Sequence, residues 1–111
     1  MTQKQFDEFI ADLEKHGYHS VKAKNRPYYY KVIEYRPDKY GCQQAVCQLI
    51  FYLYDFTDYG IDSEPYSYEP IIGVSRNSNE HIDLNVCHPK RSIDECERIA
   101  REFMKFVDNN L

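Results

Sequence analysis

The residue types of a thiol nucleophile and its helpers recur near the end of the chain. His81, Asp83, Asn85 and Cys87 occupy alternate positions, and a cysteine activated by a histidine that a third group orients is a known catalytic set. On a strand these side chains would share one face, but Cys87 and His81 would lie about 20 Å apart at ~3.3 Å per residue. That separation is far beyond hydrogen-bond reach, and the sequence contains no glycine-rich phosphate loop and no serine elbow. We therefore predict no catalytic residue and a non-enzymatic protein.

The four cysteines lack the spacing of metal ligands. Cys42 and Cys47 are separated by four residues, and Cys87 is followed directly by His88, whereas paired ligands are usually spaced as Cys-x2-Cys or His-x3-His. Cys47 and Cys96 fall on apolar positions of their segments, which is typical of buried thiols that only pack. We expect neither a metal nor a cofactor.

A basic, tyrosine-rich segment spans residues 22–31. Interleaved cations and aromatic rings are typical of surfaces that bind single-stranded nucleic acid. The whole chain carries a net charge of −4, however, and phosphate contacts normally come from a clearly basic face. Nucleic-acid binding is therefore the alternative function, and its predicted contacts are Lys22, Lys24, Arg26, Tyr28 and Lys31.

The acidic arm, residues 55–69, has the opposite charge. It contains five acids and no base, interleaved with aromatic side chains. Tyrosine offers a large contact area with one polar tip, which enriches it at protein interfaces, and the carboxylates favour association with a basic partner. The predicted partner-binding residues are Asp55, Phe56, Asp58, Tyr59, Asp62, Glu64, Tyr66, Tyr68 and Glu69.

The most apolar run, residues 43–55, is predicted to form the central strand that positions these segments. Ala45, Cys47, Leu49, Phe51 and Leu53 recur at every second position, the period of a strand with one buried face. The opposite face carries more apolar surface than a solvated sheet needs, and such patches usually mark an interface. We expect a homodimer or a docked partner at Val46, Ile50, Tyr52 and Tyr54.

The remaining segments predict an α+β fold. A helix begins at the Thr2–Gln5 capping box and ends at Gly17. Three further strands are expected at residues 28–35, 66–75 and 80–87, and a second helix runs from the Ser92 cap to about residue 108. Sequential hairpins give a four-stranded antiparallel meander, and the two terminal helices cover one face of it. The expected architecture is a two-layer sandwich formed by one domain, residues 1–111.

Composition bounds the class of protein. The chain has eleven tyrosines and no tryptophan, no apolar run long enough to span a membrane, and no secretory apolar segment at its start. We expect a cytoplasmic protein with no membrane partner. In size, acidity, tyrosine content and layout, the chain resembles the small inhibitor proteins of phages and mobile elements, and immunity proteins that neutralise toxins. The acidic arm, rather than this resemblance in general character, predicts the function: a non-enzymatic interaction domain that binds or inhibits a basic protein partner.

Overall fold

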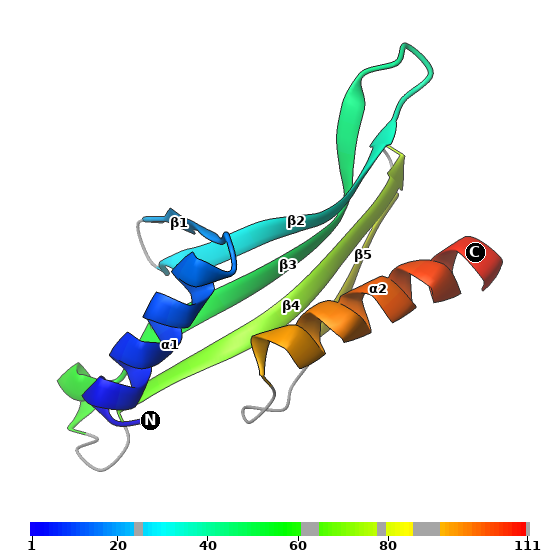
Figure 1. The fold of residues 1–111 in the computed structure, drawn as a ribbon. Coiled ribbons are helices and arrows are strands. Elements are labelled where there is room, and N and C mark those ends of the chain that lie inside the picture. Colours follow the sequence, from blue (N-terminus) through cyan, green and yellow to red (C-terminus); the bar gives the residue numbers. More distant parts are fainter. Residues whose placement is uncertain (24–25, 61–64, 78–79, 86–91, 111) are drawn as a thin grey trace.

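The computed structural model describes residues 1–23, 26–60, 65–77, 80–85 and 92–110. Within these ranges the chain forms one antiparallel sheet in the order β1-β2-β3-β4-β5, and α1 and α2 lie against the same side of it (Figure 1). The α+β class, the antiparallel sheet and the two terminal helices are therefore confirmed. The elements are α1 Gln3–Lys15, β1 His19–Val21, β2 Tyr28–Pro37, β3 Gln43–Asp55, the short 3-10 helix η1 Thr57–Tyr59, β4 Tyr66–Asn77, β5 Glu80–Asn85 and α2 Ile93–Asn110.

The predicted number of strands is wrong by one. The additional strand, β1, has only three residues, and it pairs with the first three residues of β2, from Tyr28 to Tyr30. A run this short shows no period-2 pattern of its own, so the pairing depends on the neighbouring strand rather than on local sequence. Because β1 pairs only with this end of β2, it places His19 beside Tyr30 and Ser20 beside Tyr29.

The first helix begins and ends where the sequence predicts. Thr2 Oγ1 accepts from Gln5 N at 3.3 Å and Gln5 Oε1 accepts from Thr2 N at 2.9 Å, which completes the capping box. Gly17 follows the helix with φ of +85°, a conformation that L side chains rarely adopt. The amino terminus is anchored to β4, because the Met1 ammonium donates to the Tyr66 carbonyl at 2.8 Å. This contact fixes α1 across the sheet.

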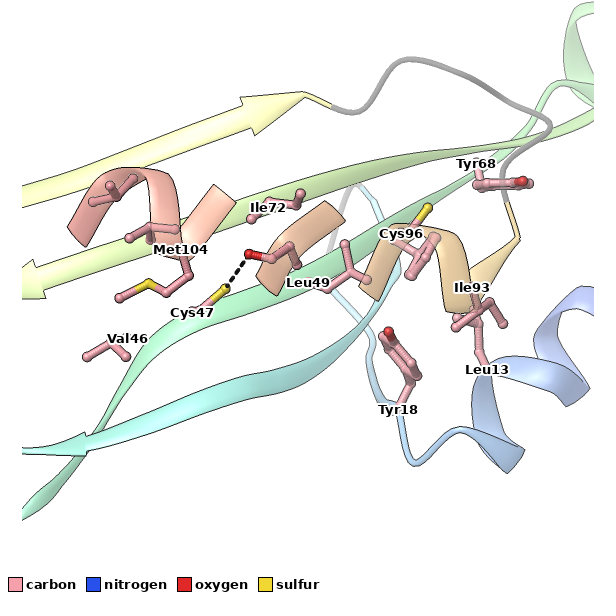
Figure 2. Packing of buried hydrophobic residues seen from close by; sticks show 14 of the residues in the cluster. Leu13, Tyr18, Val46, Cys47, Leu49, Tyr68, Ile72, Ile93, Cys96 and Met104 are labelled. Atoms are coloured by element: carbon pink, nitrogen blue, oxygen red, sulfur yellow. Dashed lines mark hydrogen bonds between the residues drawn. The ribbon is translucent and has the colours of Figure 1, made fainter. Parts of the chain in front are cut away.

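The core lies between the sheet and the two helices (Figure 2). Leu49 and Phe51 of β3 are fully buried, and the Phe51 ring packs edge-on against Phe9 of α1 at 5.5 Å between centroids. Cys47 faces α2, where its Sγ donates to the Ala100 carbonyl at 3.8 Å. The buried cluster is Leu13, Tyr18, Val46, Cys47, Leu49, Phe51, Leu53, Tyr68, Ile72, Val74, Ile93, Cys96, Ala100, Met104 and Val107.

A β-bulge corrects one prediction about β3. The pairing with β2 passes from Glu34–Cys47 to Tyr35–Ala45, so Val46 has no partner of its own. An extra residue in one strand reverses the alternation of side chains beyond it. Val46 is consequently only 5 % exposed and belongs to the core, whereas the prediction placed it on the opposite face.

Polar contacts attach α2 to β2 along its length. Lys31 Nζ and Tyr18 Oη both donate to Glu97 Oε1, at 2.8 and 3.0 Å, and burial, followed by the charge of Glu97, raises the pKa of the Tyr18 hydroxyl. Farther along, Arg36 makes two hydrogen bonds to Asp108, at 2.8 and 2.7 Å. Both helices are thus held on one side, and the other side of the sheet carries no helix in the part of the chain that the structure describes (Figure 1).

Candidate functional site

The helix-free side of the sheet presents a connected group of aromatic and aliphatic side chains. Tyr28 pairs with Tyr52 across β2 and β3, and Tyr30 pairs with Ile50. Ile50 pairs in turn with Ile71 of β4. All five side chains are half-buried and lie outside the core cluster. We call this surface, centred on Tyr28, Tyr30, Ile50, Tyr52 and Ile71, the tyrosine face.

The rings of the tyrosine face touch one another. Ring centroids are 5.5 Å apart for Tyr28 and Tyr52, 6.4 Å for Tyr28 and Tyr30, and 5.6 Å for Tyr30 and His19 of β1. Contacts of this length between aromatic rings contribute about 0.5–1.5 kcal/mol each beyond their burial. These contacts favour one arrangement of the rings, which stay half-buried among the described residues.

Polar residues surround the apolar centre. Glu69 pairs with Tyr52, Gln48 pairs with Gly73, and Asp83 pairs with Gly73 from the other side. Glu69 makes no ion pair with any residue in the described ranges. An apolar centre inside a polar margin is the usual layout of a protein interface.

The tyrosine face continues into the acidic arm. The Tyr54 ring stacks on Phe56 at 5.8 Å, and Phe56 contacts Tyr59 at 6.2 Å. Asp58 is exposed and the Tyr59 side chain is 78 % exposed. The predicted sheet-face interface and the first part of the predicted acidic interface are therefore one surface.

Three other carboxylates of the arm are either engaged locally or not described. Asp55 accepts from the hydroxyl and backbone N–H of Thr57 at 2.6 and 2.9 Å, and these hydrogen bonds lower the pKa of its carboxyl group. Asp62 and Glu64 lie outside the described residues.

Tyr66 and Tyr68 lie on the helix side of β4, which corrects their assignment to the exposed arm. Tyr66 stacks on Phe6 at 4.8 Å, and Tyr68, 9 % exposed, stacks on Phe9 at 4.1 Å. The charge pattern that defines the arm extends past the loop into a strand, where alternation decides the side of each residue. Glu69, on the other parity, is the residue of this strand that remains beside Tyr52.

The basic segment is also divided by the sheet. Lys31, predicted as a nucleic-acid contact, lies on the helix side and pairs with Glu97, so it does not accompany Tyr28. Lys22 is exposed, and Lys24 lies outside the described residues. Arg26 lies over Tyr52, with its Cζ 3.8 Å from the ring centroid, and donates to Tyr54 Oη at 2.9 Å.

Tyr30, His19 and Ile71 were not predicted as site residues. Both parities of residues 28–35 are nearly equally apolar, so the sequence alone does not assign their faces. Alternation puts Lys31 on the side opposite Tyr30, but only the structure shows that Lys31 points to the helices and pairs with Glu97, whereas a lysine in a sequence favours the solvent-exposed side. No signal in the sequence therefore assigns Tyr28 and Tyr30 to the helix-free side.

A cleft of about 330 Å³ opens between α1 and the start of α2. His16 and Asp94 span it, with Nε2 and Oδ1 3.2 Å apart. Ser92, which also lines it, accepts from the backbone N–H of Glu95 at 3.2 Å and so caps α2. The polar groups of the cleft therefore serve to join the helices. Its lining residues are Phe9, Asp12, His16, Tyr68, Ser92, Ile93 and Asp94.

The described residues contain no group of three or more potential metal ligands. Burial raises the pKa of the Cys47 thiol to about 11, which keeps it protonated and unreactive at neutral pH. Cys96 is also buried, Cys42 is exposed, and Cys87 lies outside the described residues. None of the described helices is long and apolar enough to cross a membrane.

Neither a protein-family model, nor a curated protein, nor a solved structure matches the chain.

Proposed function

We propose that this chain is a non-enzymatic binding domain that docks, and thereby inhibits or sequesters, a basic protein partner. The docking surface is the tyrosine face together with the adjoining part of the acidic arm, Asp55 to Tyr59. The observation that carries the proposal is the ring contact from Tyr54 through Phe56 to Tyr59, which joins a half-buried aromatic surface to acidic side chains.

The composition of the tyrosine face supports a protein as the partner. Its centre combines tyrosines, which present area with few rotatable bonds, with the aliphatic pair Ile50 and Ile71. A protein surface can fill such a centre and leave the polar margin hydrated. A small ligand usually needs a concave pocket that buries most of its surface.

The charge distribution supports a basic partner. The acidic arm has five acids and no base in sequence, and the exposed Asp58 lies beside the aromatic rings at its start. Glu69 adds a carboxylate next to Tyr52. Complementary charge of this kind mainly speeds association and excludes acidic competitors.

Nucleic acid is the second candidate, favoured by the open tyrosines on a sheet surface. Its support is weaker because Lys31 pairs with Glu97 on the other side of the sheet. Titration with single-stranded and duplex oligonucleotides at low salt distinguishes the two candidates. The protein-binding proposal expects no saturable binding below millimolar concentration.

Site-specific photo-crosslinking tests the proposal. A photoreactive phenylalanine analogue at Tyr30 or Tyr59 is compared with the same analogue at Glu102, which is exposed on α2. After irradiation in lysate of the source organism, the first two positions are expected to trap the same basic protein, and position 102 should not. Adducts to a second copy of this chain would indicate the predicted homodimer in place of a foreign partner. Equal trapping from all three positions would overturn the proposal.

A further inference from the structure

Arg26 occupies a position that a partner's side chain could take. Its guanidinium lies 3.8 Å above the Tyr52 ring centroid and donates to Tyr54 Oη at 2.9 Å. The residue itself is exposed and forms no ion pair with any carboxylate of the described ranges. An exposed cation over an aromatic ring is held by only about 0.5–1 kcal/mol, so this contact is easily exchanged.

The Tyr52 ring has further neighbours that could bind a cation and that make no contact of this kind with Arg26. Tyr28 stands on the β2 side, 5.5 Å away between centroids and at 60° to the Tyr52 ring. Glu69 is the direct partner of Tyr52 on the β4 side. Side chains at directly opposed positions have Cβ atoms about 4.5–5.5 Å apart, so the Glu69 side chain lies beside the Tyr52 ring, although its carboxylate makes no ion pair with Arg26.

We infer that Tyr28, Tyr52, Tyr54 and Glu69 form a receptor for an arginine side chain of the partner, and that Arg26 fills it in the free protein. Tyr52 supplies the stacking surface, the Tyr54 hydroxyl accepts a hydrogen bond, and Glu69 supplies the carboxylate. A guanidinium fits this set because it is planar, stacks on aromatic faces and presents several N–H donors in a fixed fork. This inference rests on the proposed function, since it names the chemical group by which a basic partner is recognised.

Displacement of Arg26 has a measurable consequence. A binding site that its own chain already fills shows a lower apparent affinity, in proportion to the fraction of molecules in which it is vacant. Removing the Arg26 guanidinium therefore strengthens binding of an added arginine. If Arg26 instead contacted the ligand directly, its removal would weaken binding, so the sign of the effect separates the two roles.

In the test, the blocked peptide acetyl-Gly-Arg-Gly-amide is titrated into the full chain, and two-dimensional NMR measures its binding. Arg26→Ala is expected to bind the peptide about three- to tenfold more tightly than the wild type, with the largest shifts at Tyr52, Tyr54 and Glu69. The matched peptide with citrulline, which is nearly isosteric and uncharged, should not bind. Adding Glu69→Gln to Arg26→Ala should weaken binding severalfold. Because Arg26 and Glu69 lie outside the core cluster, the remaining resonances serve as the check that both variants fold.

The inference is overturned if Arg26→Ala binds the arginine peptide no better than the wild type, or if citrulline binds equally. The proposed function is tested separately, by the effect of Ile71→Lys on the cross-linked partner. If the partner binds Ile71→Lys as tightly as the wild type, the proposed docking surface is wrong as a whole. If Ile71→Lys weakens binding but Arg26→Ala binds the arginine peptide no more tightly, only the arginine receptor is wrong.

Discussion

The two sides of the sheet use the same residue type in different ways. On the helix side, Tyr18 and Tyr29 lie under the helices and their hydroxyls donate to Glu97 and Glu14, at 3.0 and 3.3 Å. Tyr28 and Tyr30 instead touch other rings and lie outside the core cluster, on the side of the sheet that carries no helix among the described residues (Figure 1). Tyr29 and Tyr30 are adjacent in sequence. Alternation along β2 therefore separates tyrosines that pack under the helices from those on the proposed docking surface.

This difference shows why tyrosine content alone does not locate a binding surface. A phenol can be buried when its hydroxyl finds an acceptor, and it can be exposed without a large cost because one end is polar. The acceptors on the helix side are carboxylates of α1 and α2. The position of the helices thus decides the role of each tyrosine.

The largest expected effect contrasts two neighbours on β3. Phe51 is fully buried, and Phe51→Ala should lower the free energy of unfolding by about 3–5 kcal/mol, because it leaves a cavity in the core. Tyr52→Ala, at the next residue on the tyrosine face, should lower it by about 1–2 kcal/mol, through loss of the ring contact with Tyr28 and reduced strand propensity. Urea unfolding of both variants checks the contrast. Equal losses would mean that the helix-free side is also part of the stabilising core.

An intermediate effect is expected at Lys31, which belongs to the helix side. Lys31→Met leaves the Glu97 carboxylate, 8 % exposed, with the Tyr18 hydroxyl as its remaining partner, and should cost about 1–3 kcal/mol. The cost should shrink in the Glu97→Gln background, because no buried charge is then left unpaired. Chemical unfolding of the single and double variants gives this coupling. Unchanged stability with reduced partner binding would instead place Lys31 in the binding surface.

The smallest effect concerns the contact between the C-terminal end of α1 and the start of α2, made by His16 and Asp94. The hydrogen bond to the Asp12 carbonyl, at 2.7 Å, and the nearby Asp94 raise the pKa of His16 above its ordinary value of 6.5. A raised pKa in the folded state means that protonated His16 stabilises the fold below about pH 6.5, and that this contribution disappears as the pH rises through the raised pKa.

His16→Ala should therefore cost more at pH 5.5 than at pH 8, by less than about 1 kcal/mol because the pair is solvated. Asp94→Asn should reduce the pH-dependent difference without abolishing it, since the Asp12 carbonyl remains. Thermal unfolding at the two pH values measures both variants. A cost that rises with pH would contradict this role of His16, and partner binding should change with neither variant.

Much of the fold could be predicted because long periodic segments specify it. The alternation from Leu49 to Leu53 assigns the buried side of β3, and the Thr2 capping box marks the start of α1. Bulges were not predictable, because inserting Val46 into β3 leaves no composition signal. Composition also fails to assign the two sides of β2, because the two parities of residues 28–35 are nearly equally apolar.

Less of the candidate site could be predicted, for a related reason. Parity along β3 correctly predicts that Ile50, Tyr52 and Tyr54 lie outside the core cluster. The charge pattern of the acidic arm, in contrast, continues across a loop–strand boundary and groups Tyr66 and Tyr68 with exposed residues, although both stack on α1. Charge and aromatic content vary over segments, while the side of a sheet changes at each residue. Only the pairing register brings Tyr28 and Glu69 to opposite sides of Tyr52.

The most direct test of the central claim is a paired measurement on Ile71→Lys. Ile71 is half-buried at the centre of the tyrosine face, opposite Ile50, and a lysine there places a cation where a basic partner would dock. For the partner trapped by crosslinking, calorimetric titration should show a loss of affinity of at least about 100-fold, or roughly 2.7 kcal/mol. Stability should change by no more than about 1 kcal/mol, and Arg98→Ser on the exposed side of α2 should change neither quantity. Unaltered affinity of a folded Ile71→Lys variant would contradict the claim that this face is the binding surface.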